Sequence, residues 1–175
     1  MTGPSTDQAA DGVDDTRIQA FWEAARGHLG QGKLDSVLGE LVRDVVPPPS
    51  WSFGDSPALA DQLLALVLEG RKTGTSTALA EIEDEGVALP RRGELSIVTD
   101  GTGEPRALLR TTEVVVVPFD QVDEAFAAAE GEDDLSLASW RAEHERYWRR
   151  VLGDDRFTTA MPVVTERFEV VYPRR

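Results

Sequence analysis

A short turn in the middle of the chain, Asp100-Gly101-Thr102-Gly103, separates two segments with the composition of β-strands. Asp-Gly pairs favour the tight turns of β-hairpins, because glycine adopts positive φ angles without steric cost. The strands predicted on either side are Leu95 to Thr99 and Pro105 to Pro118. The second strand contains four consecutive valines, Val114 to Val117, so we expect this part to be buried on both faces. The turn therefore predicts an antiparallel pair of strands.

The predicted helices are bunched along the chain instead of alternating regularly with strands. Their apolar spacing and end signals place them at residues 16–29, 34–44, 57–69, 120–130 and 137–152. A last strand is expected at residues 161–172, and residues 75–84 fit either a strand or irregular structure. Bunched helices beside a hairpin favour an α+β fold, with a small mixed or antiparallel sheet that curls toward a barrel.

The chain of 175 residues is long enough for one good core, so we expect one main domain. Residues 1–15 are polar and acidic and are predicted to be a disordered tail. Residues 16–50 form an N-terminal helical extension that ends in the proline linker Pro47-Pro48-Pro49. The main domain is expected to occupy residues 51–175.

Composition excludes several classes of function. The chain has no cysteine, which removes disulfides, thiolate catalysis and cysteine-based metal sites, and favours a cytoplasmic protein. No secretory signal and no apolar run long enough for a membrane span is visible. The net charge of −14 disfavours duplex DNA as a partner. A local groove for a modified nucleoside or RNA stays compatible with the charge, because several arginines flank the motifs described below.

Candidate chemistry begins where an apolar helix runs into Gly70, Lys72, Gly74 and Thr75. A cation at a helix C-terminus is stabilised by the helix dipole, which is the purely structural interpretation of Lys72. The functional interpretation is that the two glycines allow a ligand close to the backbone. A lysine whose pKa is lowered by burial could then take a proton from the Thr75 hydroxyl.

An acid in an otherwise apolar strand, Glu113, is the second candidate. A charge between Thr112 and the valines is costly unless it is paired. Lys72 is the expected partner, either in a structural ion pair or as a base that Glu113 orients, and Arg110 is the alternative cation. Both interpretations predict a contact between Lys72 and Glu113.

These residues resemble a known family, the ASCH domain, whose fold is related to that of PUA domains. The resemblance covers roughly Trp51 to Tyr172 and is similar to a longer bacterial branch. It rests on Gly70-x-Lys72-x-x-Thr75, Thr112-Glu113-Val114, Glu166 to Val171 and Trp51-x-Phe53-Gly54. Family membership implies a PUA-like β-barrel with flanking helices.

The resemblance also implies a function. Short bacterial members hydrolyse the acetyl amide of N4-acetylcytidine, and their lysine, threonine and glutamate map onto Lys72, Thr75 and Glu113. Thr77 stands where the family pattern has arginine. The leading hypothesis is an amidohydrolase acting on an acylated modified nucleoside or related amide, without metal or cofactor. The alternatives are a non-catalytic module that binds RNA or a nucleotide, and an acidic protein that binds another partner.

The remaining candidates are assigned to structure. His28 and His144 lack companions at metal-ligand spacing. Two acidic runs are interpreted as solvated surface, namely residues 81–85 and residues 130–134. Trp140, Tyr147 and Trp148 share helical spacing and are expected in the core. Ligand contacts are instead expected from Trp51, Phe53 and Gly54 at the rim of a cleft, and from the backbone at Gly70 and Gly74.

Overall fold

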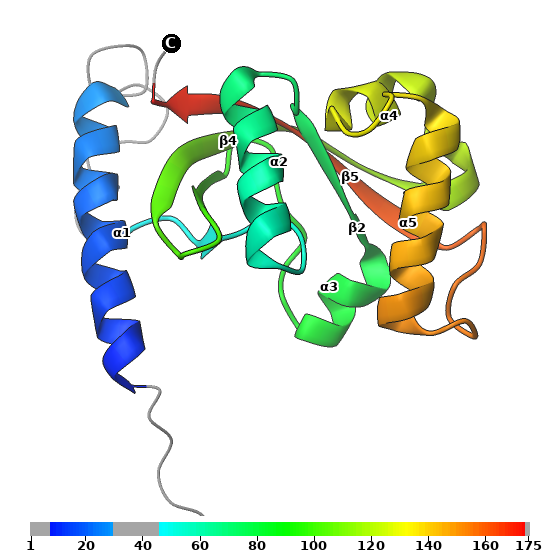
Figure 1. Ribbon diagram of the computed structural model, residues 1–175, viewed down its shortest axis with the longest axis horizontal. Coiled ribbons are helices and arrows are strands. Elements are labelled where there is room, and N and C mark those ends of the chain that lie inside the picture. Colours follow the sequence, from blue (N-terminus) through cyan, green and yellow to red (C-terminus); the bar gives the residue numbers. More distant parts are fainter. Residues whose placement is uncertain (1–7, 30–45, 174–175) are drawn as a thin grey trace, which may run out of the picture. The chain divides into compact units, whose positions relative to one another are not determined.

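The computed structural model describes residues 8–29 and 46–173, and these residues form an α+β fold built on one five-stranded sheet (Figure 1). The strand order is β1-β3-β4-β5-β2. β1 runs parallel to β3 and β2 runs antiparallel to β5, so the sheet is mixed. The predicted α+β class is confirmed. Within the described residues β1 and β2 are the edge strands, so the sheet is open. A fully closed barrel would have no edge strand.

The helices and strands follow one another in a simple order along the chain. They are α1 (Gln8–Leu29), β1 (Ser50–Trp51), α2 (Pro57–Glu69), β2 (Gly74–Ala78), α3 (Leu79–Glu85), β3 (Leu95–Thr99), β4 (Pro105–Pro118), α4 (Glu124–Glu130), α5 (Leu137–Leu152) and β5 (Pro162–Tyr172). A short 3-10 turn, Phe119–Gln121, separates β4 from α4.

Most predicted boundaries agree with these elements, and the bounds of β3, β4 and α5 are confirmed. Segment 75–84, expected to be strand or irregular, contains most of strand β2 but also most of helix α3, so neither alternative was right for its second half. α1 begins at Gln8, whereas the sequence predicted a tail as far as residue 15. Ala9 and Ala10 have high helix propensity, which favours this longer helix. Residues 1–7 and the helix predicted at 34–44 lie outside the described residues.

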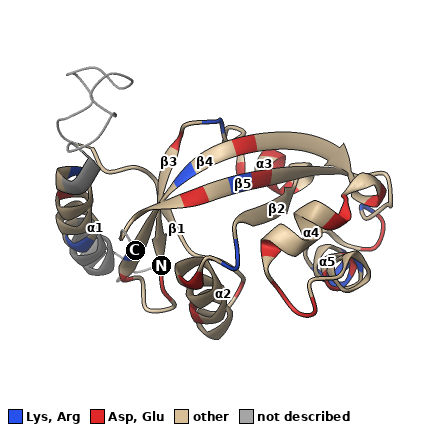
Figure 2. Cartoon of the chain, turned by 90° about the horizontal axis from the view of Figure 1, so that it is seen from above, with Lys and Arg blue, Asp and Glu red and all other residues tan. Residues whose placement is uncertain are grey.

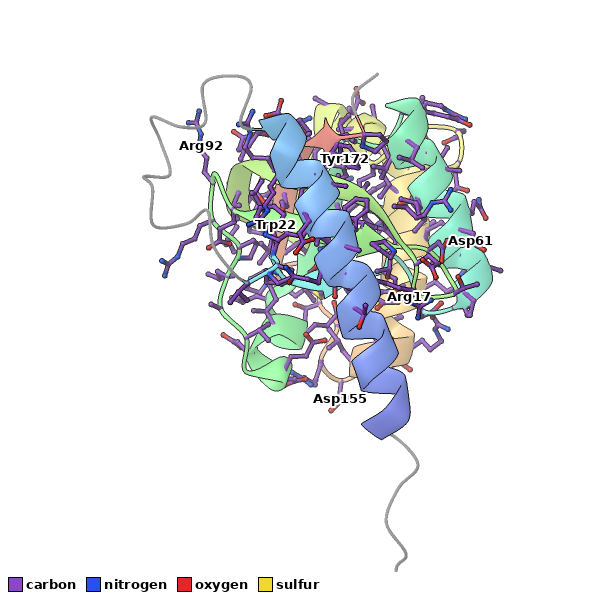
Figure 3. The ribbon with its side chains drawn as sticks, turned by 90° about the vertical axis from the view of Figure 1, so that its left-hand side faces the viewer. Arg17, Trp22, Asp61, Arg92, Asp155 and Tyr172 are labelled. Carbon is purple, nitrogen blue, oxygen red and sulfur yellow. The ribbon has the colours of Figure 1, made fainter. Side chains whose placement is uncertain are left out.

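The chain divides into two compact units. In the first, which contains the described residues 8–29, 46–64, 95–109 and 170–173, α1 buries Trp22 and Ala25 with Ile97 and Leu108. The ring of Phe21 meets that of Tyr172 edge to face at 5.4 Å. Figure 3 shows Trp22 on α1 and Tyr172 near the end of β5. This core explains why the apolar side chains of α1 recur with helical spacing.

The second unit contains residues 65–94 and 110–169 and has an aromatic core. Phe119 lies at its centre, within 6 Å of three other aromatic rings. The fully or largely buried members of this core are Ala78, Phe119, Val122, Phe126, Ala127, Trp140, Trp148, Phe157, Met161 and Val163. The expectation that Trp140 and Trp148 belong to the core is confirmed, and Tyr147 packs against it.

The valines of β4 are more exposed to solvent than the sequence predicted. Val115 and Val116 are 43% and 45% exposed, so burial on both faces was wrong for this part of the strand. Neighbouring residues of a strand point to opposite faces, so each face is partly open to solvent here. The apolar run therefore reflects β propensity as much as burial.

No helix in the described ranges is both long enough and apolar enough to cross a membrane.

Candidate functional site

Lys72 is a buried lysine at the start of the second unit. Gly70, with a φ of 73°, ends α2, and the backbone amides of Arg71 and Lys72 both donate to the carbonyl oxygen of Leu66. This turn directs the chain into β2 and turns Lys72 inward. Its side chain is 1% exposed, whereas that of Arg71 next to it is 57% exposed. Lys72 is thus more than a solvated cation at a helix end.

Two glutamates, the last residue of α4 and a residue just beyond it, neutralise the buried ammonium group. The Lys72 Nζ atom lies 3.2 Å from Glu130 Oε2 and 2.6 Å from Glu132 Oε1. It also donates to the Glu130 carbonyl oxygen at 3.3 Å. Glu130 is as buried as Lys72, whereas Glu132 is 32% exposed and links the pair to the surface.

The second oxygen of Glu130 accepts two further hydrogen bonds. Ser76 Oγ donates to Glu130 Oε1 at 2.5 Å, and Trp140 Nε1 donates to the same atom at 2.9 Å. His144 Nε2 lies 3.7 Å from it. Lys72, Ser76, Glu130, Glu132 and His144 are hereafter called the Lys72–Glu130 cluster. They come from β2 and its approach, the end of α4, and α5.

Both charges of the central pair are held in their ionised forms. Burial alone lowers the pKa of Lys72, but the carboxylates of Glu130 and Glu132 outweigh burial, and the pKa is raised above its ordinary value. Burial alone raises the pKa of Glu130, but Lys72, then His144, Ser76 and Trp140 outweigh it, and this pKa is lowered. Lys72 therefore keeps its proton at neutral pH, and this direction does not support a base with a lowered pKa.

Thr75 is directed away from this cluster. Side chains alternate along a strand, so Ser76, which contacts Glu130, and Thr75 lie on opposite faces of β2. Thr75 stands opposite Glu166 of β5 in the antiparallel register. The structure thus brings the hydroxyl of Ser76, rather than that of Thr75, to the buried ion pair.

Glu113 is not the acid that pairs with Lys72. Its side chain is 58% exposed and its Oε2 lies 3.4 Å from Arg167 Nε. The expected ion pair between Lys72 and Glu113 is replaced by the pairs with Glu130 and Glu132. The physical reason is that Glu113 lies in the open half of β4, where solvent stabilises its charge without a buried cation. Arg110, the alternative cation, pairs with Glu169.

Glu166 is a second partly buried acid, on the Thr75 face of the sheet. Its Oε1 accepts a hydrogen bond from Thr111 Oγ1 at 2.5 Å. Burial raises the pKa of Glu166, and the neighbouring carboxylate of Glu94 adds to this rise, although the Thr111 bond opposes it. Thr75 and Glu166 therefore lie opposite each other across β2 and β5, apart from the Lys72–Glu130 cluster.

The residues predicted at the rim belong to the first unit. Trp51 is partly exposed and meets Phe53 edge to face at 4.5 Å. Phe53 is buried, so its ring faces are occupied by protein. Gly54 has a φ of 69°, and a Cβ there would lie 2.6 Å from Leu59 Cγ, so packing explains this glycine. The backbone conformation and packing at this position therefore explain the glycine without a bound ligand.

The two glycines around Lys72 also have structural roles. Gly70 is the positive-φ residue that ends α2. Gly74 is buried, and a Cβ there would lie 3.2 Å from the Phe126 ring and 3.3 Å from the Glu166 carbonyl oxygen. Gly74 therefore lets β2 approach α4 and β5, and this approach helps to place Ser76.

Sequence reasoning missed Glu130, Glu132, Ser76 and His144. Glu130 was assigned to a solvated acidic run, yet it lies four residues after the apolar Phe126 on the same helix face. That spacing, followed by a glycine cap, was the available signal. The pairing with Lys72 joins residues 58 positions apart and has no local signature. Among the described residues, no group of three acidic, histidine or cysteine side chains is arranged to hold a metal ion.

Comparison with known proteins assigns the chain to a family. The family model described as "ASCH domain" matches residues 49–172. The crystal structure of an ASCH domain from Lactobacillus crispatus JV V101 is 29% identical, with a TM-score of 0.74, over 90% of this chain and 95% of that one. Protein EF3133 from Enterococcus faecalis V583 is 32% identical, with a TM-score of 0.70, over 89% and 88% of the two chains. No curated protein matches the chain.

Proposed function

This chain belongs to the ASCH domain family, a family with a PUA-like fold, and we propose that it hydrolyses the amide of an acylated modified nucleoside, such as N4-acetylcytidine, or of a related small molecule. The observation that carries the proposal is the 2.5 Å hydrogen bond from the Ser76 hydroxyl to the Glu130 carboxylate. A hydroxyl held by a carboxylate, beside a buried cation, is an arrangement suited to nucleophilic acyl transfer.

The proposed roles follow from the charge states. Glu130 is ionised at neutral pH and can accept the Ser76 proton as the Ser76 Oγ atom attacks the acyl carbon. The proton then passes to the leaving amine as the amide C–N bond breaks. Water hydrolyses the acyl ester on Ser76 and regenerates the hydroxyl. Lys72 stays protonated and pairs with Glu130 Oε2, the oxygen that Ser76 does not contact, so it positions the carboxylate and donates no catalytic proton.

Two members of the cluster are partly exposed to solvent. Ser76 is partly exposed, and Glu132 is 32% exposed. Figure 2 shows basic residues in blue just before β2 and acidic residues in red just after α4. Lys72 and the two glutamates that pair with it belong to these segments. We place the activity in the cytoplasm because the chain has no cysteine to suggest an oxidising compartment.

The test is turnover of N-acylated nucleosides by the purified protein, followed by chromatography of the free nucleoside. We expect the wild type to release the acyl group and Ser76→Ala to lower kcat roughly 10²-fold or more, in the range of lost catalytic groups. Thr75→Ala is the matched control, since Thr75 is the neighbouring hydroxyl on the other face of β2. If Thr75→Ala lost turnover and Ser76→Ala retained it, the nucleophile would be Thr75, the threonine of the family pattern, and not Ser76.

One observation favours a second function, a non-catalytic module that binds RNA or a nucleotide. Lys72 and Glu130 are already fully engaged with protein groups, as expected of a structural ion pair. Absence of turnover together with calorimetric binding of N4-acetylcytidine or a single-stranded RNA would select this function. Absence of both responses would favour a protein partner instead.

A further inference from the structure

His144 is the member of the Lys72–Glu130 cluster on α5, and its orientation fixes which ring nitrogen always carries a proton. Its ring stacks on Trp140, with centroids 4.2 Å apart and planes inclined by 20°. The Nδ1 atom lies 2.9 Å from the carbonyl oxygen of Trp140. A carbonyl oxygen only accepts hydrogen bonds, so Nδ1 carries a proton in both charge states of the ring.

The second ring nitrogen is therefore the one that gains and loses a proton. Nε2 faces Glu130 Oε1 at 3.7 Å, and that oxygen also accepts the Ser76 hydroxyl. The His144 side chain is 17% exposed, so protons can exchange between the ring and solvent.

The net charge of the cluster depends on whether His144 carries its second proton. Lys72 contributes one positive charge, and Glu130 and Glu132 contribute two negative charges. These three are the other charged members of the cluster. On α5 itself the ring of His144 contacts the uncharged Trp140 and Trp148. A protonated His144 makes the cluster neutral, and a neutral His144 leaves it with one excess negative charge.

We propose that His144 is the proton carrier of this site. It acts through Glu130, with which it exchanges the proton. The inference rests on the proposed function. When Ser76 attacks the acyl carbon, its proton moves to Glu130 Oε1 and then to His144 Nε2, which forms the imidazolium. The same proton returns through Glu130 to the leaving amine nitrogen. No proton is lost, and Lys72 keeps its own throughout.

The first experiment needs no substrate. Long-range ¹H–¹⁵N spectra of the histidine rings report which nitrogen carries the proton. The chain has two histidines, so His28→Gln assigns the signals. At alkaline pH we expect His144 in the Nδ1–H tautomer, and we expect Glu130→Gln to shift its ring signals while those of His28 stay unchanged. An Nε2–H tautomer, or signals indifferent to Glu130→Gln, would overturn the inference.

The second experiment is the pH profile of turnover. His144→Asn keeps an amide donor toward the Trp140 carbonyl but cannot titrate. We expect it to fold, to lower kcat roughly 10- to 100-fold with KM little changed, and to remove one limb of the pH profile. A wild-type kcat and profile in His144→Asn would overturn the proton-carrier role.

The two experiments separate the inference from its premise. If the wild type hydrolyses no acylated nucleoside, the proposed function fails and the proton-transfer role fails with it. The tautomer and its response to Glu130→Gln would still decide whether His144 is coupled to Glu130. If turnover is present but the Nε2–H tautomer is found, the hydrolase stands and His144 is a core histidine.

Discussion

A Cβ atom at Gly131 would lie 2.4 Å from the carbonyl oxygen of Arg71, so the turn that ends α4 lies directly against the segment that carries Lys72. The Thr73 amide donates to the Ala129 carbonyl oxygen at 2.7 Å and joins the same two segments. This backbone approach places Glu130 and Glu132 beside the lysine. The buried ion pair therefore depends on a residue without a side chain.

Gly131→Ala tests this approach, with Gly86→Ala as its matched control. Both glycines follow short helices and have positive φ, 74° and 66°, but a Cβ at Gly86 meets nothing within 4 Å. We expect Gly86→Ala to cost roughly 1–2 kcal/mol from backbone strain alone. Gly131→Ala adds a backbone clash, so its loss in urea unfolding should be at least about 2 kcal/mol larger. Equal losses in the two variants would show that the approach is not tight.

Lys72→Met is expected to leave the buried Glu130 carboxylate without its main cation. Removal of one partner of a buried ion pair costs about 3–5 kcal/mol of unfolding free energy. The double variant Lys72→Met with Glu130→Gln removes both charges and should recover a measurable part of that loss. Arg71→Met, at an exposed position, is the control and should stay within about 0.5 kcal/mol of wild type. A single Lys72→Met variant as stable as wild type would contradict the role given to this pair.

Glu81 is a structural acid that joins α3 to α5. Its Oε2 accepts from the Ala78 amide at 2.9 Å and from Trp148 Nε1 at 2.8 Å, and its Oε1 accepts from the Tyr147 hydroxyl at 3.2 Å. Glu81→Ala leaves the buried indole nitrogen without an acceptor and should cost about 1–3 kcal/mol. Chemical denaturation followed by tryptophan fluorescence measures the loss. Glu85→Ala, exposed on the same helix, should change little, and a comparable loss there would contradict the assignment.

The raised pKa of Glu166 predicts a pH-dependent contribution to stability. The folded state binds the Glu166 proton more tightly than the unfolded state, so its contribution is fully present below the unfolded pKa. That contribution is lost as the pH rises through the folded pKa. Glu166→Gln keeps a partner for Thr111 without the charge and should therefore raise the Tm at pH 7. Glu113→Gln, at an exposed position, is the control, and a lower Tm for Glu166→Gln would contradict the prediction.

Local sequence signals were enough for most of the elements. The turn at residues 100–103 predicted the antiparallel neighbours β3 and β4, and apolar spacing predicted α5 with its correct bounds. These signals work because a hairpin turn and a helical apolar stripe involve residues close in sequence. The motif pattern and closing strand were also enough to suggest the family that the comparison shows.

The partner of Lys72 was decided only by the tertiary structure. The sequence placed Glu113 in an apolar strand and Glu130 in an acidic run, and their burial is the reverse of what those contexts suggest. Val115 and Val116 leave β4 open to solvent, so Glu113 is hydrated there. Gly131 lets α4 approach Lys72 closely, so Glu130 becomes buried and paired. The sequence by itself thus determined most of the strands and helices, and it singled out Lys72 as one half of an ion pair. Which acid meets it depends on packing between segments far apart in the chain, because burial belongs to the folded arrangement and not to neighbours in sequence.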